Sequence, residues 1–205
     1  MVSVASLTKL TERVLPGPTP SFSAPHLVLI FLTIADGTYV GRAALAQRAN
    51  LGEGAGRTIL KKLRDAGYVD AVRAGCYLTK SGSRVAASLR ITMSLVDVPR
   101  SDLSMGRCQT ALILRGAGMK VKSGLEQRDS AIKIGASGAT TYLMKSGRFT
   151  IPGGSGDCEK DYPSTAWTTL RKELTPRNGD AVVLCGAEGE VSARLGAIAA
   201  ALTLA

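Results

Sequence analysis

Three cationic residues, Arg57, Lys61 and Arg64, recur at i, i+4 and i+7 within residues 55–66. The apolar residues of this segment also recur at helical spacing, but on another face: Ile59, Leu60 and Leu63. In an α-helix this pattern gives a basic stripe that points away from an apolar core. Guanidinium groups can donate two hydrogen bonds to guanine, and both Lys and Arg bind backbone phosphates. The segment therefore predicts a helix that contacts double-stranded DNA.

The expected contacts extend beyond the stripe itself. Arg57 lies in the first helical turn, where recognition helices reach base edges, and Arg73 lies in a hairpin that follows the helix. The residues predicted to bind DNA are Arg57, Thr58, Lys61, Lys62, Arg64 and Arg73. A solvated helix face explains many basic stripes, and a winged helix can also serve protein–protein contact, so both readings stay as alternatives.

The neighbouring segments give this helix a place in a winged helix-turn-helix. Ser23 is a helix cap with Pro25 in the first turn, and His26 is expected to cap or pack there. A short β-prone segment and a small-residue helix follow, and then a turn, the basic helix and a hairpin. The expected ranges are Thr38–Val40, Arg42–Asn50, the turn Gly52–Gly54, the helix Ala55–Ala66, strands Tyr68–Arg73 and Cys76–Leu78 around Ala74-Gly75, and a helix capped by Thr79.

The charge of the chain is concentrated in the same region. The formal net charge is +10, and residues 41–90 hold ten Lys or Arg against three Asp or Glu. This segment therefore carries seven of the ten net positive charges. A basic segment of this kind attracts polyanions, of which nucleic acid is the most common in a cell.

A second group of polar residues lies between residues 122 and 129. If residues 125–134 form a helix, Leu125, Asp129 and Ile132 share one face, and a carboxylate on an apolar stripe needs a partner or a ligand. We expect a small polar effector to bind there. The residues assigned to it are Lys122, Glu126, Gln127, Arg128 and Asp129. An internal salt bridge or a helix cap explains the same residues equally well.

The second half of the chain alternates strand-like and helical segments, which predicts an α/β domain. Expected strands are 109–114, 140–145, 149–151 and 181–185, and expected helices are 125–134, 163–174 and 191–202. The fold class is therefore α+β or α/β, with an N-terminal winged helix followed by a smaller α/β domain. The expected domains are an N-terminal extension over 1–20, the winged helix over 21–95, and a domain over 96–205 for effector binding or dimerisation.

Composition argues against several kinds of site. The four cysteines are far apart in the sequence, so we expect reduced thiols and no metal site. The single histidine, His26, lies in the predicted winged helix and not in the C-terminal domain, so no nucleophile–base pair can be assembled there. We therefore expect no catalytic residues and no cofactor. The apolar run at 26–35 is about half of the ~20 residues a membrane span needs. We expect a soluble, cytoplasmic homodimer. The alternative is an enzyme acting on a small polar metabolite, with the winged helix as a regulatory module.

Several short segments give the chain a resemblance to a known group. They are Ser23–Pro25, Leu51–Gly54 with Arg57-Thr58, Leu78–Gly82, Ser123–Asp129 and Gly138–Thr141. With these segments the chain resembles an archaeal family of winged-helix proteins that carry a C-terminal domain of unknown function. The resemblance covers about residue 21 to the C-terminus. It implies an archaeal, cytoplasmic transcriptional regulator, and it assigns no catalytic residues.

Overall fold

The structure, a computed structural model, describes residues 4–12 and 21–205. The chain divides into two compact units, Met1–Arg90 and Ile91–Ala205. The boundary precedes the predicted one because the segment after residue 92 is a strand of the second sheet. The second unit is also the larger of the two, so the expectation of a smaller C-terminal domain is wrong. None of the helices in the described ranges has the length and hydropathy needed to cross a bilayer.

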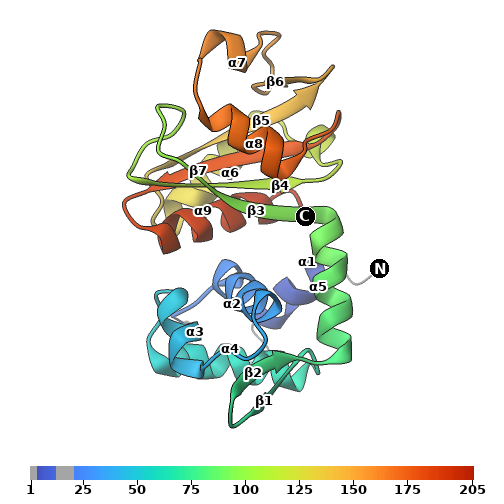
Figure 1. The fold of residues 1–205 in the computed structure, drawn as a ribbon, viewed down its shortest axis with the longest axis vertical. Coiled ribbons are helices and arrows are strands. Elements are labelled where there is room, and N and C mark those ends of the chain that lie inside the picture. Colours follow the sequence, from blue (N-terminus) through green and yellow to red (C-terminus); the bar gives the residue numbers. More distant parts are fainter. Residues whose placement is uncertain (1–3, 13–20) are drawn as a thin grey trace. The chain divides into compact units, whose positions relative to one another are not determined.

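The first unit consists of helices packed together with a small two-stranded hairpin (Figure 1). Its elements are α1 (Val4–Thr8), η1 (Lys9–Thr11), α2 (Ala24–Asp36), α3 (Arg42–Arg48), α4 (Glu53–Asp65), β1 (Val69–Val72), β2 (Gly75–Leu78) and α5 (Lys80–Thr92). β1 and β2 pair antiparallel, and Val40 adds an isolated antiparallel bridge to Cys76. This order of three helices, a hairpin and a further helix is that of a winged helix-turn-helix.

Helix α2 forms the centre of this unit because it is apolar on nearly every side. Leu27, Ile30 and Phe31 are at most 1% exposed. At its start, the backbone N–H of Ser23 donates to Nδ1 of His26 over 3.1 Å, which completes a capping box. Of the two roles expected for His26 from the sequence, capping or packing, the structure shows the capping role.

Part of the predicted N-terminal extension belongs to the same core. α1 packs against α2, and Leu7 is fully buried. Residues 1–3 and 13–20, which include Pro16, Pro18 and Pro20, lie outside the described residues. The extension is therefore not wholly separate from the winged helix, because it supplies one of its buried side chains.

The second unit is a five-stranded sheet with helices on both faces (Figure 1). Its elements are β3 (Met93–Val98), β4 (Cys108–Leu114), η2 (Gly118–Lys120), α6 (Leu125–Lys133), β5 (Gly138–Lys145), β6 (Arg148–Thr150), α7 (Cys158–Asp161), α8 (Ala166–Leu174), β7 (Ala181–Ala187) and α9 (Glu190–Leu202). The strand order is β3-β4-β7-β5-β6, and every neighbouring pair is antiparallel. The unit is therefore α+β rather than a parallel α/β domain.

Two cores result from the alternation of side chains along the strands. Ile113, Tyr142 and Leu184 face α8, where they meet Trp167 and Phe149. The other face of the sheet is covered by α6 and α9, which also contact each other. The approach of α9 is close, since a Cβ at Gly196 would lie 2.5 Å from Sγ of Cys185 and 2.8 Å from Cβ of Ala136.

Candidate nucleic-acid interface

Helix α4 is the element predicted to contact DNA, and it begins earlier than expected. Gly52 is its N-cap residue, and Glu53 and Gly54 form the first helical turn rather than a loop. The reversal of direction after α3 falls instead on Asn50, which adopts a positive φ of 52°. The prediction of a Gly52–Gly54 turn is therefore wrong, and Glu53 becomes a residue of the basic helix.

The contact between α3 and α4 depends on small residues. A Cβ built on Gly56 would lie 3.0 Å from Cβ of Ala46, so the two helices are as close as ordinary packing allows. Ile59, Leu60 and Leu63 are at most 5% exposed and anchor α4 to the core of the unit. This fixes which face of α4 remains in solvent.

The predicted DNA-binding residues of α4 lie on that solvent face. Arg57, Thr58, Lys61 and Arg64 are exposed, and Lys62 is half-buried. The hydroxyl of Thr58 donates to the carbonyl of Gly54 over 3.0 Å, within the helix. Surface exposure of these side chains meets the first requirement for contact with a polyanion.

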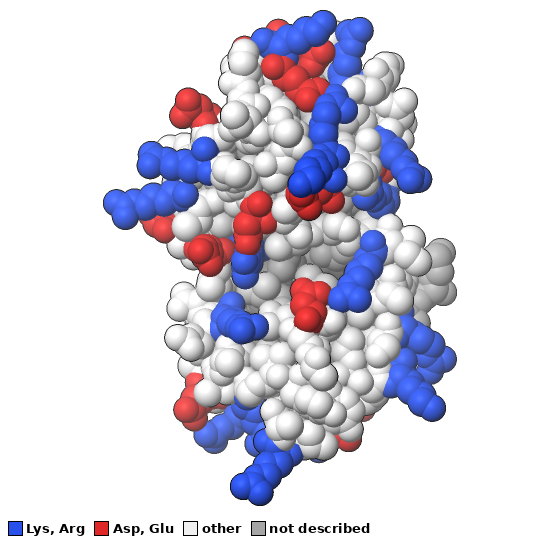
Figure 2. All heavy atoms as spheres, in the orientation of Figure 1, with Lys and Arg blue, Asp and Glu red and all other residues white. Residues whose placement is uncertain are grey.

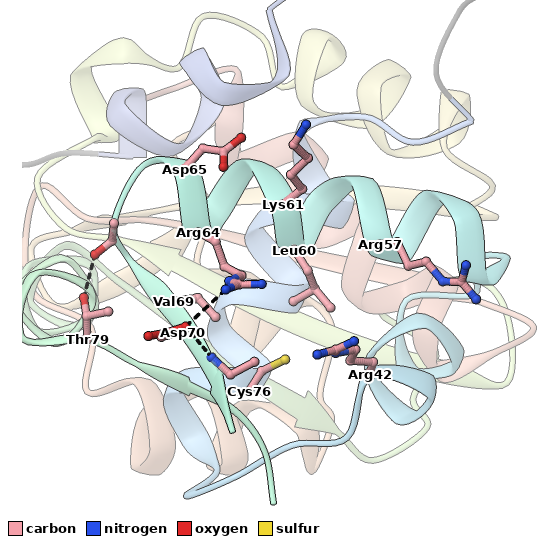
Figure 3. Close-up of a pocket in the computed structure, with 12 residues that line it drawn as sticks. Arg42, Arg57, Leu60, Lys61, Arg64, Asp65, Val69, Asp70, Cys76 and Thr79 are labelled. Atoms are coloured by element: carbon pink, nitrogen blue, oxygen red, sulfur yellow. Dashed lines mark hydrogen bonds and ion pairs between the residues drawn. The ribbon is translucent and has the colours of Figure 1, made fainter. Parts of the chain in front are cut away.

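The cations flank the helix instead of forming one row. Figure 3 shows Arg64 directed towards β1 and Arg42, whereas Lys61 and Asp65 leave the opposite side of α4. Arg64 lies beside β1, where it pairs with Asp70, and Arg57 lies at the N-terminal end of α4, nearer to Arg42. Lys61 leaves the helix on the other side. The single stripe inferred from spacing is therefore two flanks of one exposed face.

A hollow of about 620 Å³ lies between α4, α3 and the hairpin. Three guanidinium-bearing residues line it: Arg42, Arg57 and Arg64. Arg42 was missed by the sequence analysis, although its position at the start of the helix before the turn was available as a signal. The hollow gives unit 1 a concave basic surface next to the exposed face of α4.

The thiol of Cys76 lines the same hollow from below. Cys76 is 1% exposed, and burial raises the pKa of its thiol, an effect that the guanidinium of Arg42 partly offsets. The thiol is therefore protonated at neutral pH and packs as a small apolar group. The charged groups at the wall of the hollow are therefore the three arginines and Lys61, together with Asp65 and Asp70.

Two of the arginines have carboxylate partners within unit 1. Arg57 lies 2.8 Å from Glu53, and Arg64 lies 3.5 Å from Asp70, with all four side chains at least half exposed. Exposed ion pairs of this kind contribute little to stability, about 0–1 kcal/mol each. The guanidinium groups can therefore exchange these partners for phosphate or base acceptors at small cost.

The wing is a tight hairpin with Arg73 at its tip. Val72 pairs with Gly75, so the two-residue loop is Arg73-Ala74 rather than the expected Ala74-Gly75. Gly75 instead belongs to β2, where a Cβ would lie 2.9 Å from the backbone of Val40 and φ is 143°. Arg73 is exposed at the loop, which is the position from which a wing reaches a nucleic-acid backbone.

Positive charge occurs on both units but is less balanced on the first. Residues 1–90 carry twelve Lys or Arg against five Asp or Glu, and residues 91–205 carry fourteen against eleven. On the face drawn in Figure 2, blue and red side chains are interspersed. The excess that would attract a polyanion therefore belongs mainly to the unit that holds α4.

The five residues predicted to bind an effector are not assembled in one site. Gln127 is 1% exposed, and its Nε2 donates to Oγ1 of Thr203 over 2.6 Å, which ties α6 to the end of α9. Arg128 and Asp129 pair with each other over 3.0 Å on the surface. Lys122 lies 3.9 Å from Glu126. For Gln127, the contacts therefore support a structural role within the protein, which was the alternative to ligand binding.

The expectation that Asp129 lies on a buried apolar face of α6 is wrong. Leu125 and Ile132, which share its face, are 50% and 47% exposed, so this face of α6 is not buried. The helix packs through Gln127 and Ala131 instead. A carboxylate on this solvent-facing side needs no buried partner, because water solvates it.

In the described ranges, the cysteines form no disulfide, and no cluster of His, Cys, Asp or Glu is placed to bind a metal ion. All four cysteines are free, and three of them are buried. Burial raises the pKa of Cys185 to about 12, so that thiol stays protonated. Within the part of the chain that the structure describes, no group of three or more His, Cys, Asp or Glu is placed to hold a metal ion.

Comparison with known proteins places the second unit in context. Residues 105–204 match the model of a protein family described as a domain of unknown function, DUF4443. No curated protein matches the chain. The match supports the part of the sequence-based resemblance that concerns the C-terminal domain.

Two solved structures are similar to the chain. The hypothetical protein PH0730 from Pyrococcus horikoshii OT3 is 27% identical, with a TM-score of 0.74 over 90% of this chain and 93% of that chain. A MarR family protein from Mycobacterium tuberculosis, Rv2887, is 25% identical, with a TM-score of 0.31 over 42% of this chain and 64% of that chain. The first similarity shows that the two-unit fold occurs in another protein.

Proposed function

We propose that this chain is a transcriptional regulator that binds double-stranded DNA through unit 1. The observation that carries the proposal is the exposed face of α4, which presents Arg57, Lys61 and Arg64 beside a hollow lined by Arg42. An α-helix fits the major groove of B-DNA, and its N-terminal residues then reach base edges.

Each cation has a role that follows from its position. Arg57, in the second turn of α4, donates to a guanine, while Lys61, Lys62 and Arg64 contact phosphates farther along the helix. Arg73, at the tip of the hairpin, reaches the neighbouring backbone or the minor groove. Thr58 adjoins Arg57 on the exposed face and contacts a base or a phosphate.

Unit 2 supplies the regulatory part of the proposal. We expect it to respond to a small effector or to hold two copies of the chain together. A homodimer would place two α4 helices on half-sites about 34–36 Å apart, the spacing of one turn of DNA. Analytical ultracentrifugation of the full chain at micromolar concentration, with and without DNA, measures whether two copies associate.

DNA binding is tested by fluorescence anisotropy with a labelled random-sequence duplex over a range of salt concentrations. We expect affinity to fall with salt, as phosphate contacts require, and to drop strongly in the triple variant R57A/K61A/R64A. The matched control is K133A/K160A/K172A, which removes three exposed cations from unit 2. Equal losses in the two triple variants would contradict the assignment to α4.

Sequence preference is a separate requirement for a regulator. Selection of bound duplexes from a random pool should enrich one motif with the full-length protein. Binding that depends on α4 but enriches no motif would leave a general DNA-binding protein and would rule out a sequence-specific regulator.

A further inference from the structure

A second hollow, of about 630 Å³, lies within unit 2 and is not used by the proposed DNA contacts. It lies where the end of β5, η2, the segment after β6 and residues 178–179 meet. Its wall is apolar and is formed by Val121, Leu143, Pro152 and the largely exposed Met119. This combination of a concave surface and apolar side chains is typical of small-molecule sites.

The base of the hollow is fixed by backbone hydrogen bonds between segments distant in sequence. Gly118 N donates to Gly179 O over 2.7 Å, and Gly179 N donates to Met144 O over 2.9 Å. A Cβ on Gly118 would lie 2.8 Å from the Gly179 carbonyl oxygen, so these two backbone segments can approach each other only because Gly118 has no side chain. The base therefore exists before any ligand arrives.

Nearby, the carboxylate of Asp180 is fully engaged on its own network. It accepts hydrogen bonds from Gly116 N and Arg177 N, both over 2.9 Å, and pairs with Arg115 over 3.0 Å. This network anchors the segment that carries Asn178 and Gly179. Asp180 thus stiffens one side of the hollow without adding a free negative charge to it.

The charged residues that line the hollow are both cationic. Lys122 and Lys145 line it, and the described lining includes no carboxylate. Ser146 and Asn178 add polar groups, although Oδ1 of Asn178 already accepts from Gly147 N over 2.8 Å. Among the residues that the structure describes, Glu126 is the acid that approaches these lysines, at the loose distance of 3.9 Å from Lys122.

We propose that this hollow binds a small amphipathic anion, a molecule with a carboxylate or phosphate head and an apolar body. Lys122 and Lys145 hold the head, and Val121, Leu143 and Pro152 contact the body. Of the five residues assigned to an effector from the sequence, Lys122 belongs to this site. The proposal rests on the geometry of unit 2 and does not require that unit 1 binds DNA.

The test uses n-hexyl phosphate as a probe of this chemistry. The full chain, labelled with ¹⁵N and free of DNA, is titrated while the amide signals of Gly118, Gly153 and Gly179 are followed. We expect saturable shifts of these signals. Inorganic phosphate and n-hexanol, which each lack one half of the ligand, should bind much more weakly.

Point variants assign the charges. K122A and K145A should each weaken hexyl phosphate binding about fivefold, the size expected for one cation a few ångströms from an anion in water. K133A, an exposed lysine on α6 that does not line the hollow, should leave the affinity unchanged. E126Q should tighten binding, because it removes the carboxylate that competes for Lys122.

Two results would overturn the proposal: no saturable shift at millimolar probe, or affinity that neither lysine variant changes. Equal affinity for inorganic phosphate and hexyl phosphate would overturn the amphipathic class, because the apolar wall would then contribute nothing. Since each arm is measured without DNA, these outcomes are independent of the tests on α4.

Discussion

The guanidinium of Arg57 lies 2.8 Å from the carboxylate of Glu53, one turn earlier on α4, with both side chains about three-quarters exposed. The residue expected to read a base is therefore paired, in the free protein, with an acid on the same solvent face. Because Glu53 lies in the first helical turn, it also interacts favourably with the positive end of the helix dipole. Any DNA that Arg57 contacts must displace this carboxylate and tolerate its charge.

Substitution of Glu53 by Gln should strengthen binding to random-sequence DNA. The change frees Arg57 and removes a negative charge from the proposed interface, so we expect a tighter complex with a salt dependence steeper by up to about one phosphate contact. Anisotropy titrations at several salt concentrations measure both quantities. E173Q, which removes an exposed acid from unit 2, serves as the control. Weaker binding by E53Q would indicate that Glu53 itself contacts the DNA.

Arg57 and Lys62 should differ in what they contribute. We expect Arg57→Ala to cost about 1–3 kcal/mol on the preferred sequence and to relax preference at one base pair, as loss of a paired guanine contact does. Lys62→Ala should weaken binding to all sequences alike and lower the salt slope by about one. Parallel titrations with preferred and scrambled duplexes separate these effects. A uniform loss for Arg57→Ala would reassign it to a phosphate.

The single histidine should make unit 1 less stable in mild acid. Burial lowers the pKa of His26 below its ordinary value of 6.5, and a smaller contribution from the Ser23 backbone acts in the opposite direction. The unfolded chain therefore takes up this proton more readily than the folded chain. The contribution of neutral His26 to the stability of unit 1 is therefore fully present above about pH 6.5, and it is lost as the pH falls below that value.

The proton resonances of the His26 ring give a direct reading of this effect, because the sequence has no other histidine. We expect a titration midpoint below 6.5 and a free energy of unfolding that rises between pH 5 and 7. H26Q should remove most of that rise. A midpoint at or above 6.5 would show that burial does not control the titration of this ring.

Asp180 should be among the more important polar residues of unit 2. Burial alone would raise the pKa of its carboxyl, but the Arg177 and Gly116 amides and the Arg115 guanidinium hold that pKa below the ordinary value. D180N places an amide group against these donors, and we expect a loss of about 3 kcal/mol. Trp167, the one tryptophan in the sequence, reports unfolding of this unit by fluorescence. The control is D102N, which changes an exposed acid. Equal, small losses of stability in D180N and D102N would show that the Asp180 network does not stabilise this unit.

Two glycines of unit 1 should respond in opposite ways to alanine. A Cβ on Gly82 would overlap the carbonyl oxygen of Tyr68, so G82A should lower stability by about 1–3 kcal/mol as overpacking does. A Cβ on Gly54 meets nothing within 4 Å, and G54A should stabilise α4 by about 0.5–1 kcal/mol. Thermal unfolding followed by circular dichroism compares the pair. Equal melting temperatures for G82A and the unsubstituted protein would mean that α5 can move away from Tyr68 without loss of stability.

Patterns within short segments predicted unit 1 well. The periodicity of Ile59, Leu60 and Leu63 identified the buried side of α4, and the capping residues Ser23 and Thr79 identified where α2 and α5 begin. The exact turns were less predictable. Gly52–Gly54 and Ala74-Gly75 are plausible turns by composition, but the contact of Gly75 with Val40 assigned the latter glycine to a strand.

The candidate sites show a sharper division. The spacing of Arg57, Lys61 and Arg64 correctly predicted that they are exposed, because helical periodicity sets them apart from the buried residues of α4. Their contact with DNA stays a prediction. Arg42 was not found, since it reaches the same hollow from another helix. Gln127 was assigned to a ligand because no local pattern indicates that Thr203, on a distant segment, accepts its amide proton.

The sequence by itself determined that a basic amphipathic helix follows a small-residue helix and precedes a hairpin, since each of these is encoded within a few consecutive residues. Only the tertiary structure decided that the second sheet is antiparallel, that Asp129 faces solvent, and that Lys122 and Lys145 line one hollow. These features depend on which distant segments pack together. Such packing is a property of the whole core, and the spacing of residues along the chain does not record it.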